Sequence, residues 1–186
     1  MVASTKGGFA QVDPSSVKMF TDDESQDFLK NKSELWKNTK PLSDFAGKAN
    51  EFAAIFYVGG HGPVFDLVND ATSHKVINEF WESGKIVSAV CHGPAALAEV
   101  KLNDGSYLIK DSPITAFTNA EEDQVGLSDA MPYMLETKLS QNGGKFENGG
   151  AWAEKVVIGR EGRLITGQNP ASATAIGKAV AQAIKA

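Results

Sequence analysis

The sequence predicts an α/β fold built on a mainly parallel sheet, with helices on both of its faces. Segments of strand character alternate along the chain with segments of helix character, which is the pattern of successive βα units. Two strand segments, 52–58 and 86–90, are apolar at almost every position, as in strands that are covered on both faces. Both run into glycine-containing turns. Because sites in open α/β sheets lie at the carboxyl ends of strands, we expect a functional site there.

The composition is that of an ordinary soluble globular protein. The 186 residues are 42% hydrophobic and 22% charged, so one domain spanning residues 1–186 is expected. The net charge of −5 argues against nucleic acid or an anionic membrane as a partner. No apolar run approaches the ~20 residues of a membrane span, and residues 1–10 lack the apolar core of a signal peptide. A single cysteine suits a reducing compartment, so we expect a cytoplasmic protein.

The other elements follow from local patterns of apolar spacing and turn residues. Apolar side chains three and four positions apart predict helices that pack one face, and alternation around a glycine turn predicts a hairpin. In chain order these patterns predict a surface helical segment at 20–40, a crossover helix at 72–84, a short strand at 112–117, a helix at 133–140, a hairpin at 156–166 and a final helix after Pro170.

Cys91 is the only cysteine, and it lies where the strand 86–90 meets His92-Gly93-Pro94. Proline suits the first turn of a helix and 95–98 continue as helix formers, so a strand, a sharp turn and a helix are expected with the thiol at the apex. The N-terminus of that helix is expected to lower the pKa of the thiol. The alternative is a buried Cys91 that acts as a small hydrophobe. The adjacent histidine and glycine favour the reactive role.

The other strand end, Gly59-Gly60-His61-Gly62, holds three glycines in four positions. Backbone N–H groups of this loop and of His92 could form an oxyanion hole, while the alternative is that the glycines serve packing alone. A cysteine nucleophile needs a base within reach. Of the three histidines, His74 is expected on the surface, which leaves His61 and His92.

An acidic cluster at 121–123 follows the strand at 112–117. Spacing favours a solvated helix start, and the alternative is that one carboxylate orients a histidine. One cysteine and two histidines without clustered carboxylates make a weak zinc site, so no metal is expected. No phosphate-binding GxGxxG or GxxxxGKS motif occurs in the sequence.

The segment 89–94, with the glycine loop 59–62 upstream, closely resembles the DJ-1/PfpI superfamily, and within it the Hsp31-like, glutathione-independent glyoxalase III branch. The resemblance runs from end to end, with further matches at 7–8, 12–14, 61–66, 114–119 and 167–172. It implies a flavodoxin-like three-layer α/β sandwich with a cysteine nucleophile elbow, in a homodimer. It also implies that a small dicarbonyl, methylglyoxal, is converted to D-lactate without a cofactor, with possible deglycase activity.

The resemblance assigns roles to individual residues. Cys91 would add to the aldehyde carbon as a thiolate, and His92 would move the proton between the two carbons of the hemithioacetal. Glu122 matches the acidic residue that orients that histidine. Gly60 and the backbone of His92 would hold the oxyanion, with His61 beside them in the substrate site. A second function stays open, namely a non-catalytic stress-response chaperone or an oxidant sensor that acts through Cys91.

The start of the sequence departs from the family pattern. Relatives open with a strand and a helix before the segment matched by residues 4–8, and that unit carries a glutamate that hydrogen-bonds the catalytic cysteine. This departure has three interpretations. The sequence is a fragment, another subunit fills the gap, or the protein is stable but inactive. The question that follows is whether the residues present in this sequence are enough to activate Cys91.

Overall fold

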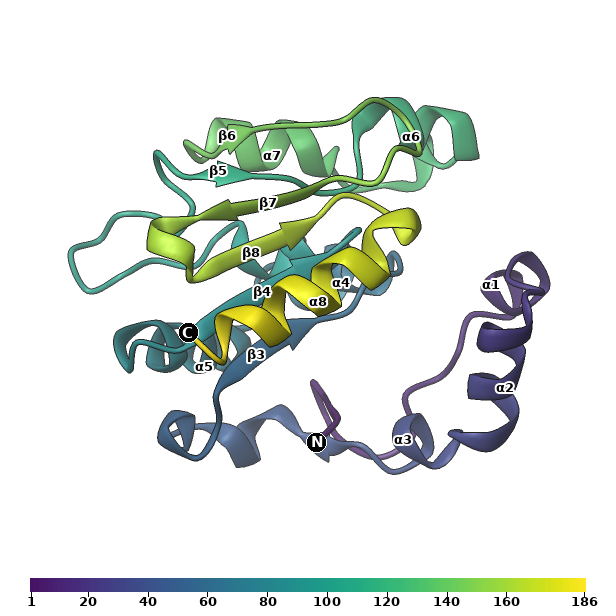
Figure 1. Cartoon of the computed structure of the whole chain (residues 1–186), viewed down its shortest axis with the longest axis horizontal. Helices are drawn as coiled ribbons and strands as arrows, with labels where there is room; N and C mark the ends of the chain where they lie inside the picture. Colours follow the sequence, from purple (N-terminus) through teal and green to yellow (C-terminus); the bar gives the residue numbers. More distant parts are fainter. The chain divides into compact units, whose positions relative to one another are not determined.

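The computed structural model describes residues 1–186 apart from the side chain of Ser15. Its contacts divide the chain into two compact units, residues 1–46 and residues 47–186 (Figure 1). Each unit is described by itself. The single domain expected over residues 1–186 stays a prediction.

The larger unit is built on a four-stranded sheet in the order β3-β4-β8-β7 (Figure 1). Strands β3 (Ala54–Tyr57), β4 (Ile86–Val90) and β8 (Leu164–Gly167) run parallel to one another. Strand β7 (Val156–Gly159) pairs antiparallel with β8 and forms the expected hairpin. This arrangement confirms the α/β fold with a mainly parallel sheet.

Two helices pack on the four-stranded sheet. Helix α5 contacts β3 and β4, and helix α8 contacts β4 and β8, which it crosses in Figure 1. The helices and remaining strands of this unit are α4 (Gly62–Asp66), α5 (Ala71–Glu82), α6 (Asn119–Val125), α7 (Leu135–Gln141), α8 (Ala173–Ala183), β5 (Pro113–Ile114) and β6 (Lys145–Phe146). Short 3-10 helices are η2 (Ala49–Glu51), η3 (Gly93–Leu97), η4 (Ser128–Ala130), η5 (Arg160–Gly162) and η6 (Pro170–Ser172).

Strand β4 is the centre of this core, since all five of its residues are buried. Ile86 and Val90 pack with Ile165 of β8 and Ile176 of α8 in one buried cluster. Each such aliphatic side chain contributes roughly 1.5–3 kcal/mol when it leaves water. The strand that carries Cys91 at its end is therefore firmly held.

Three expectations about local structure are wrong in detail. β3 is an edge strand and is not covered on both faces, because α5 packs on it whereas α8 packs on β4 and β8. Phe56 is therefore 40% exposed, and Val58 after the strand is 69% exposed. The segment after Cys91 forms the 3-10 helix η3 instead of an α-helix, as its Ala98 N–H bonds to the Ala95 carbonyl three residues back. The strand expected at 112–117 is reduced to the two residues of β5.

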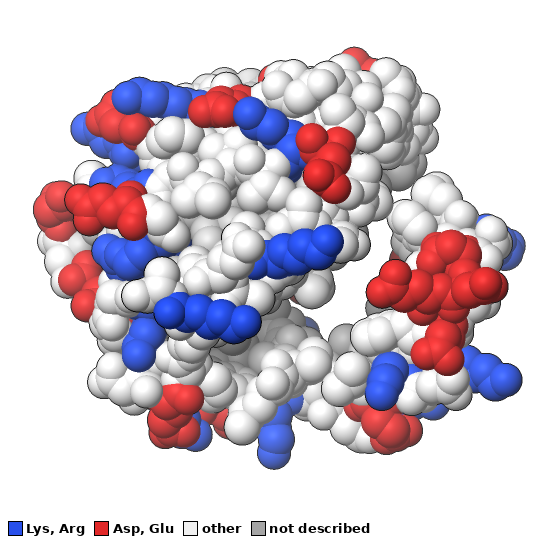
Figure 2. Space-filling model, viewed as in Figure 1, with Lys and Arg blue, Asp and Glu red and all other residues white. Residues whose placement is uncertain are grey.

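The smaller unit holds a two-stranded parallel sheet and short surface helices. Its elements are β1 (Ala3–Ser4), α1 (Pro14–Met19), α2 (Asp23–Asn31), α3 (Glu34–Lys37), β2 (Lys40–Pro41) and η1 (Leu42–Phe45). Helix α2 is capped by Asp22, whose carboxylate accepts from the Ser25 N–H at 2.9 Å. Figure 2 shows acidic side chains gathered over this helix. The unit matches the surface helical segment expected at 20–40.

Neither α2 nor α3 buries a side chain completely, and their apolar residues instead meet each other. The rings of Phe28 and Trp36 stack with centroids 5.5 Å apart. Over all the helices whose residues are described, none has the length and apolar character needed to cross a membrane.

Candidate active site

Cys91 lies on a sharp turn directly after β4, with a φ of 61° that places it in the left-handed region. Few residues other than glycine adopt this conformation, and its cost is characteristic of strained functional turns. The turn packs closely on the end of β3. A Cβ atom at Gly59 would lie 2.7 Å from the Cβ of Cys91, and one at Gly93 would overlap the Tyr57 carbonyl oxygen. Both glycines are therefore required by close packing around the thiol, and the expected elbow is confirmed.

The Cys91 thiol is surrounded by hydrogen-bonding groups from two loops. The backbone N–H groups of Gly60 and His92 lie close enough to Sγ to favour the thiolate, and Nδ1 of His92 lies 3.5 Å away. Burial raises the pKa of the thiol to about 11, although the two N–H groups act in the opposite direction. The expectation that a helix N-terminus lowers this pKa is wrong, because only the short η3 follows and burial dominates. Attack by the thiol therefore needs a base.

His92 is held by Glu122 on the side of the ring away from the thiol. Its Nε2 lies 2.6 Å from Glu122 Oε2, and only 2% of the residue is exposed. Burial lowers the pKa of His92 despite the adjacent carboxylate, so the ring is neutral near pH 7. A neutral ring that donates from Nε2 to the carboxylate keeps its lone pair on Nδ1. That nitrogen faces Sγ and can accept the thiol proton.

The other oxygen of Glu122 is bound by His61. Nε2 of His61 lies 2.9 Å from Oε1, and the rings of His61 and His92 have centroids 4.1 Å apart. The side chain of His61 is 31% exposed, whereas that of Glu122 is 6% exposed. One nitrogen of each imidazole and one carboxylate oxygen lie within 4.8 Å of one another. These three side chains could therefore hold a metal ion.

Glu122 reaches this position because α6 begins with a capping box. Thr118 accepts from the Glu121 N–H at 3.1 Å, and the Glu121 carboxylate accepts from the Thr118 N–H at 2.9 Å. This fixes the first turn of α6 and directs Glu122 inward. The preference for a solvated acidic cluster is wrong for Glu121 and Glu122, which are buried, and holds only for Asp123.

Glu121 is a structural residue that sequence analysis missed. Its Oε1 accepts hydrogen bonds from the Trp152 backbone at 2.8 Å, from Gln168 at 3.0 Å and from Asn169 at 2.7 Å. Burial opposes ionisation, but these donors and Thr118 outweigh it and lower the pKa of Glu121. The carboxylate thus ties the loops behind the site together. The Thr-x-x-Glu capping-box spacing was the signal that could have identified it.

Aromatic side chains form one wall beside the histidine. The Phe117 ring lies 4.5 Å from the His92 ring, and Trp152 meets Phe117 edge-on at 5.7 Å. Phe117 is 5% exposed, while Trp152 is 45% exposed. The wall shields His92 from water and keeps its ring in place.

The structure brings together every residue predicted for the site. The backbone of Gly60, at a φ of 84°, lies beside the thiol and lowers its pKa. The residues that converge are Gly60, His61, Cys91, His92 and Glu122. Their catalytic roles stay predictions. His74 lies elsewhere, with its Nε2 bound to the Val68 carbonyl at 2.9 Å.

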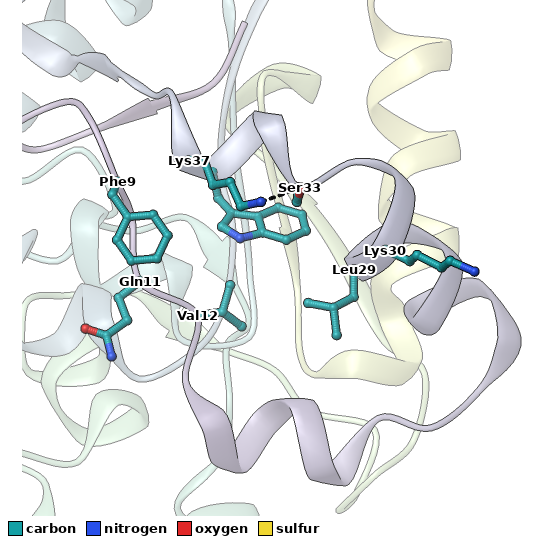
Figure 3. Close-up of a pocket in the computed structure, with 8 residues that line it drawn as sticks. Phe9, Gln11, Val12, Leu29, Lys30, Ser33 and Lys37 are labelled. Atoms are coloured by element: carbon teal, nitrogen blue, oxygen red, sulfur yellow. Dashed lines mark hydrogen bonds between the residues drawn. The ribbon is translucent and has the colours of Figure 1, made fainter.

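A separate cavity of about 480 Å³ lies within the smaller unit (Figure 3). Figure 3 shows Phe9, Val12 and Leu29 around it, with Lys37 donating to the Ser33 hydroxyl at 3.0 Å. None of the residues predicted for the site lines it.

The chain is similar to known proteins in both sequence and structure. Glyoxalase 3 of Candida albicans is 34% identical over 184 residues, which cover 92% of this chain and 75% of that protein. The crystal structure of glyoxalase III from Candida albicans has a TM-score of 0.85 at 32% identity, over 97% of this chain and 78% of that one. The X-ray structure of the Rapid Encystment Protein of Francisella tularensis has a TM-score of 0.87 at 35% identity, over 96% of this chain and 78% of that one. Residues 37–183 match the DJ-1/PfpI family, and with an intact cysteine elbow at the end of β4 the chain belongs to that family.

Proposed function

We propose that the protein is a glutathione-independent glyoxalase that converts methylglyoxal to D-lactate without a cofactor. The observation that carries this proposal is the arrangement of Cys91 and His92. A thiol that lies beside the backbone N–H groups of Gly60 and His92 is 3.5 Å from Nδ1 of a histidine whose other nitrogen is fixed by Glu122. These are a nucleophile, a base and an orienting carboxylate in the order that covalent catalysis needs.

The first step forms a hemithioacetal. Nδ1 of His92 takes the thiol proton as Sγ bonds to the aldehyde carbon, and the carbonyl oxygen becomes an oxyanion. The N–H groups of Gly60 and His92 point at this region and stabilise that charge. The oxyanion then takes the proton back from the imidazolium. His92 is neutral again and is ready for the second step.

The second step moves a proton between the two carbons. His92 removes the hydrogen of the former aldehyde carbon, and the ketone oxygen gains a proton, which gives an enediol. His92 then returns a proton to the neighbouring carbon as the hydroxyl of the first carbon loses its proton, so one hydroxyl proton has moved from the first oxygen to the second. The first carbon is oxidised to a thioester and the second is reduced to a secondary alcohol, so the electron pair stays within the substrate. Water then hydrolyses the thioester, which releases lactate and regenerates the thiol. Because the redox change is internal, the reaction needs no external oxidant or reductant.

The Candida albicans relative named Glyoxalase 3 supports this proposal. A single enantiomer of lactate is expected if the proton is returned to one face of a bound enediol by a base that Glu122 holds in place. The D enantiomer is the one that the family resemblance implies. The same thiol addition would act on methylglyoxal carried by an amine, which is the possible deglycase activity.

Methylglyoxal loss and D-lactate formation test the proposal in the absence of glutathione and added metal. D-Lactate is measured with a stereospecific dehydrogenase, for the protein and for a Cys91→Ser variant whose fold is checked by circular dichroism. We expect turnover by the protein and none by the variant. A folded protein without turnover would overturn the proposal and leave the oxidant sensor or chaperone, in which Cys91 oxidises without consuming a dicarbonyl.

A further inference from the structure

We infer that His61, His92 and Glu122 bind a divalent transition-metal ion such as Zn²⁺, and that the bound ion blocks the catalytic base. Metal binding is independent of the proposed glyoxalase function, and only the inhibition rests on it. The ion would be an inhibitor and not a cofactor. The observation is that a carboxylate and two imidazoles from three separate segments place their donor atoms within 4.8 Å of one another.

The three donors already lie close together. Glu122 places one oxygen 2.6 Å from Nε2 of His92 and the other 2.9 Å from Nε2 of His61. Nitrogen and oxygen donors bind zinc at about 2.0–2.2 Å, so donors in a tetrahedral site lie about 3.3 Å apart. Since all three donor atoms lie within 4.8 Å of one another, side-chain movements of about 1–2 Å complete the set. An ion would replace the two protons that now join the imidazoles to the carboxylate.

The donor types and the burial also fit a transition metal. Two imidazoles and one carboxylate suit Zn²⁺, Co²⁺ or Ni²⁺ better than Mg²⁺ or Ca²⁺, which prefer oxygen donors alone. His92 and Glu122 are buried and therefore fixed, whereas His61 is 31% exposed and offers a path for entry. Sequence spacing argued against a metal site because no carboxylate lay near the histidines. The fold supplies that carboxylate from α6, 30 residues after His92.

Metal binding would change which nitrogen of His92 carries the proton. A metal ion on Nε2 leaves the single proton of the neutral ring on Nδ1. Nδ1 lies 3.5 Å from Sγ of Cys91 and would then present an N–H where a lone pair is needed. The thiol would lose the base that accepts its proton. We therefore expect inhibition that is reversed by a chelator.

Histidine ring NMR tests the site directly, because the chain has only three histidines. Metal-free protein is titrated with Zn²⁺ while the ring nitrogens are followed by long-range ¹H–¹⁵N correlation. We expect Nε2 of His61 and of His92 to shift with one equivalent of Zn²⁺, and both nitrogens of His74 to stay unchanged. Binding through exposed carboxylates would leave all three rings unshifted and would overturn the inference.

Calorimetry with variants gives a second readout that does not depend on activity. We expect one Zn²⁺ per chain, with affinity reduced more than about tenfold in His61→Asn and in Glu122→Gln. His74→Asn is the matched histidine control, and Cys91→Ser should retain Zn²⁺ because Sγ is not in the donor set. Unchanged affinity in His61→Asn, or loss of binding in Cys91→Ser, would contradict the inference. A protein that binds Zn²⁺ but lacks turnover would refute the proposed function and leave the metal site intact.

Discussion

Glu122 Oε2 and His92 Nε2 lie 2.6 Å apart in the buried interior, and this pairing determines the proton position on the imidazole. Since the carboxylate accepts from Nε2, the opposite nitrogen is free to accept the thiol proton. The direction of the catalytic proton transfer is therefore set by a residue that does not touch the thiol. Glu122 is a positioning residue, and the first prediction concerns it.

Glu122→Gln should lower kcat for methylglyoxal by about 10²–10⁴-fold, because a neutral amide no longer fixes the His92 tautomer. KM should change far less, since Glu122 lies on the far side of the imidazole from the thiol. The measurement is steady-state kinetics with circular dichroism on the same samples. Asp123→Asn is the control, an exposed acid on the same helix. Equal kcat values for Glu122→Gln and the wild type would contradict the assigned role.

Local sequence was enough to predict the elbow but not the state of its thiol. Cys91 is flanked by an apolar strand and by glycine and proline, and those short-range patterns fix the turn. The thiol pKa depends instead on burial beneath residues distant in sequence, and so the expected lowering was wrong. The acidic cluster shows the same limit, since spacing cannot tell that Glu121 and Glu122 turn inward while Asp123 stays exposed. Family resemblance, and not spacing, identified Glu122.

Strand β3 illustrates a limit of hydropathy patterns. Its sequence is apolar throughout, yet its position at the edge of the sheet leaves Phe56 exposed. Strand order is decided by long-range pairing that a hydropathy pattern does not contain. The homodimer, the cytoplasmic location and the absence of a nucleic-acid partner stay predictions, since none of them can be read from the fold of a single chain.

Glu121→Gln should destabilise the fold by about 2–4 kcal/mol, because an amide group would oppose one or more of the donors that now meet the carboxylate. The pKa of Glu121 is lowered, so its stabilisation is complete above the ordinary carboxyl pKa of about 4.3 and is lost as the pH falls through the folded value. Urea unfolding at pH 7 therefore measures it in full. Asp123→Asn should change the free energy of unfolding by less than about 0.5 kcal/mol. Similar unfolding curves for both variants would refute the structural role.

Alkylation of Cys91 by iodoacetamide should rise steadily with pH without levelling off near 8.5, where an ordinary thiol is half ionised. The reason is that burial raises the pKa of this thiol to about 11, and only the thiolate reacts. The rate should increase about tenfold per pH unit across the range from 7 to 10, as the Henderson–Hasselbalch relation requires below the pKa. Mass spectrometry follows the reaction cleanly because the chain has one cysteine. A plateau below pH 8 would show that the resting protein holds a thiolate.

Gly59→Ala should reduce both stability and activity, because its Cβ would lie 2.7 Å from the Cβ of Cys91 and 3.3 Å from Sγ. Relief of that overlap must move the thiol or the end of β3, at a cost of about 1–3 kcal/mol. Gly62→Ala is the matched control three residues along, since a Cβ there meets nothing within 4 Å. Thermal unfolding and kcat for methylglyoxal are measured on both. We expect a lower Tm and at least about a hundredfold lower kcat for Gly59→Ala, since displacement of a reacting group by about 1 Å has effects of that size. Wild-type kinetics in Gly59→Ala would show that the thiol position tolerates movement and that the elbow is less constrained than its contacts indicate.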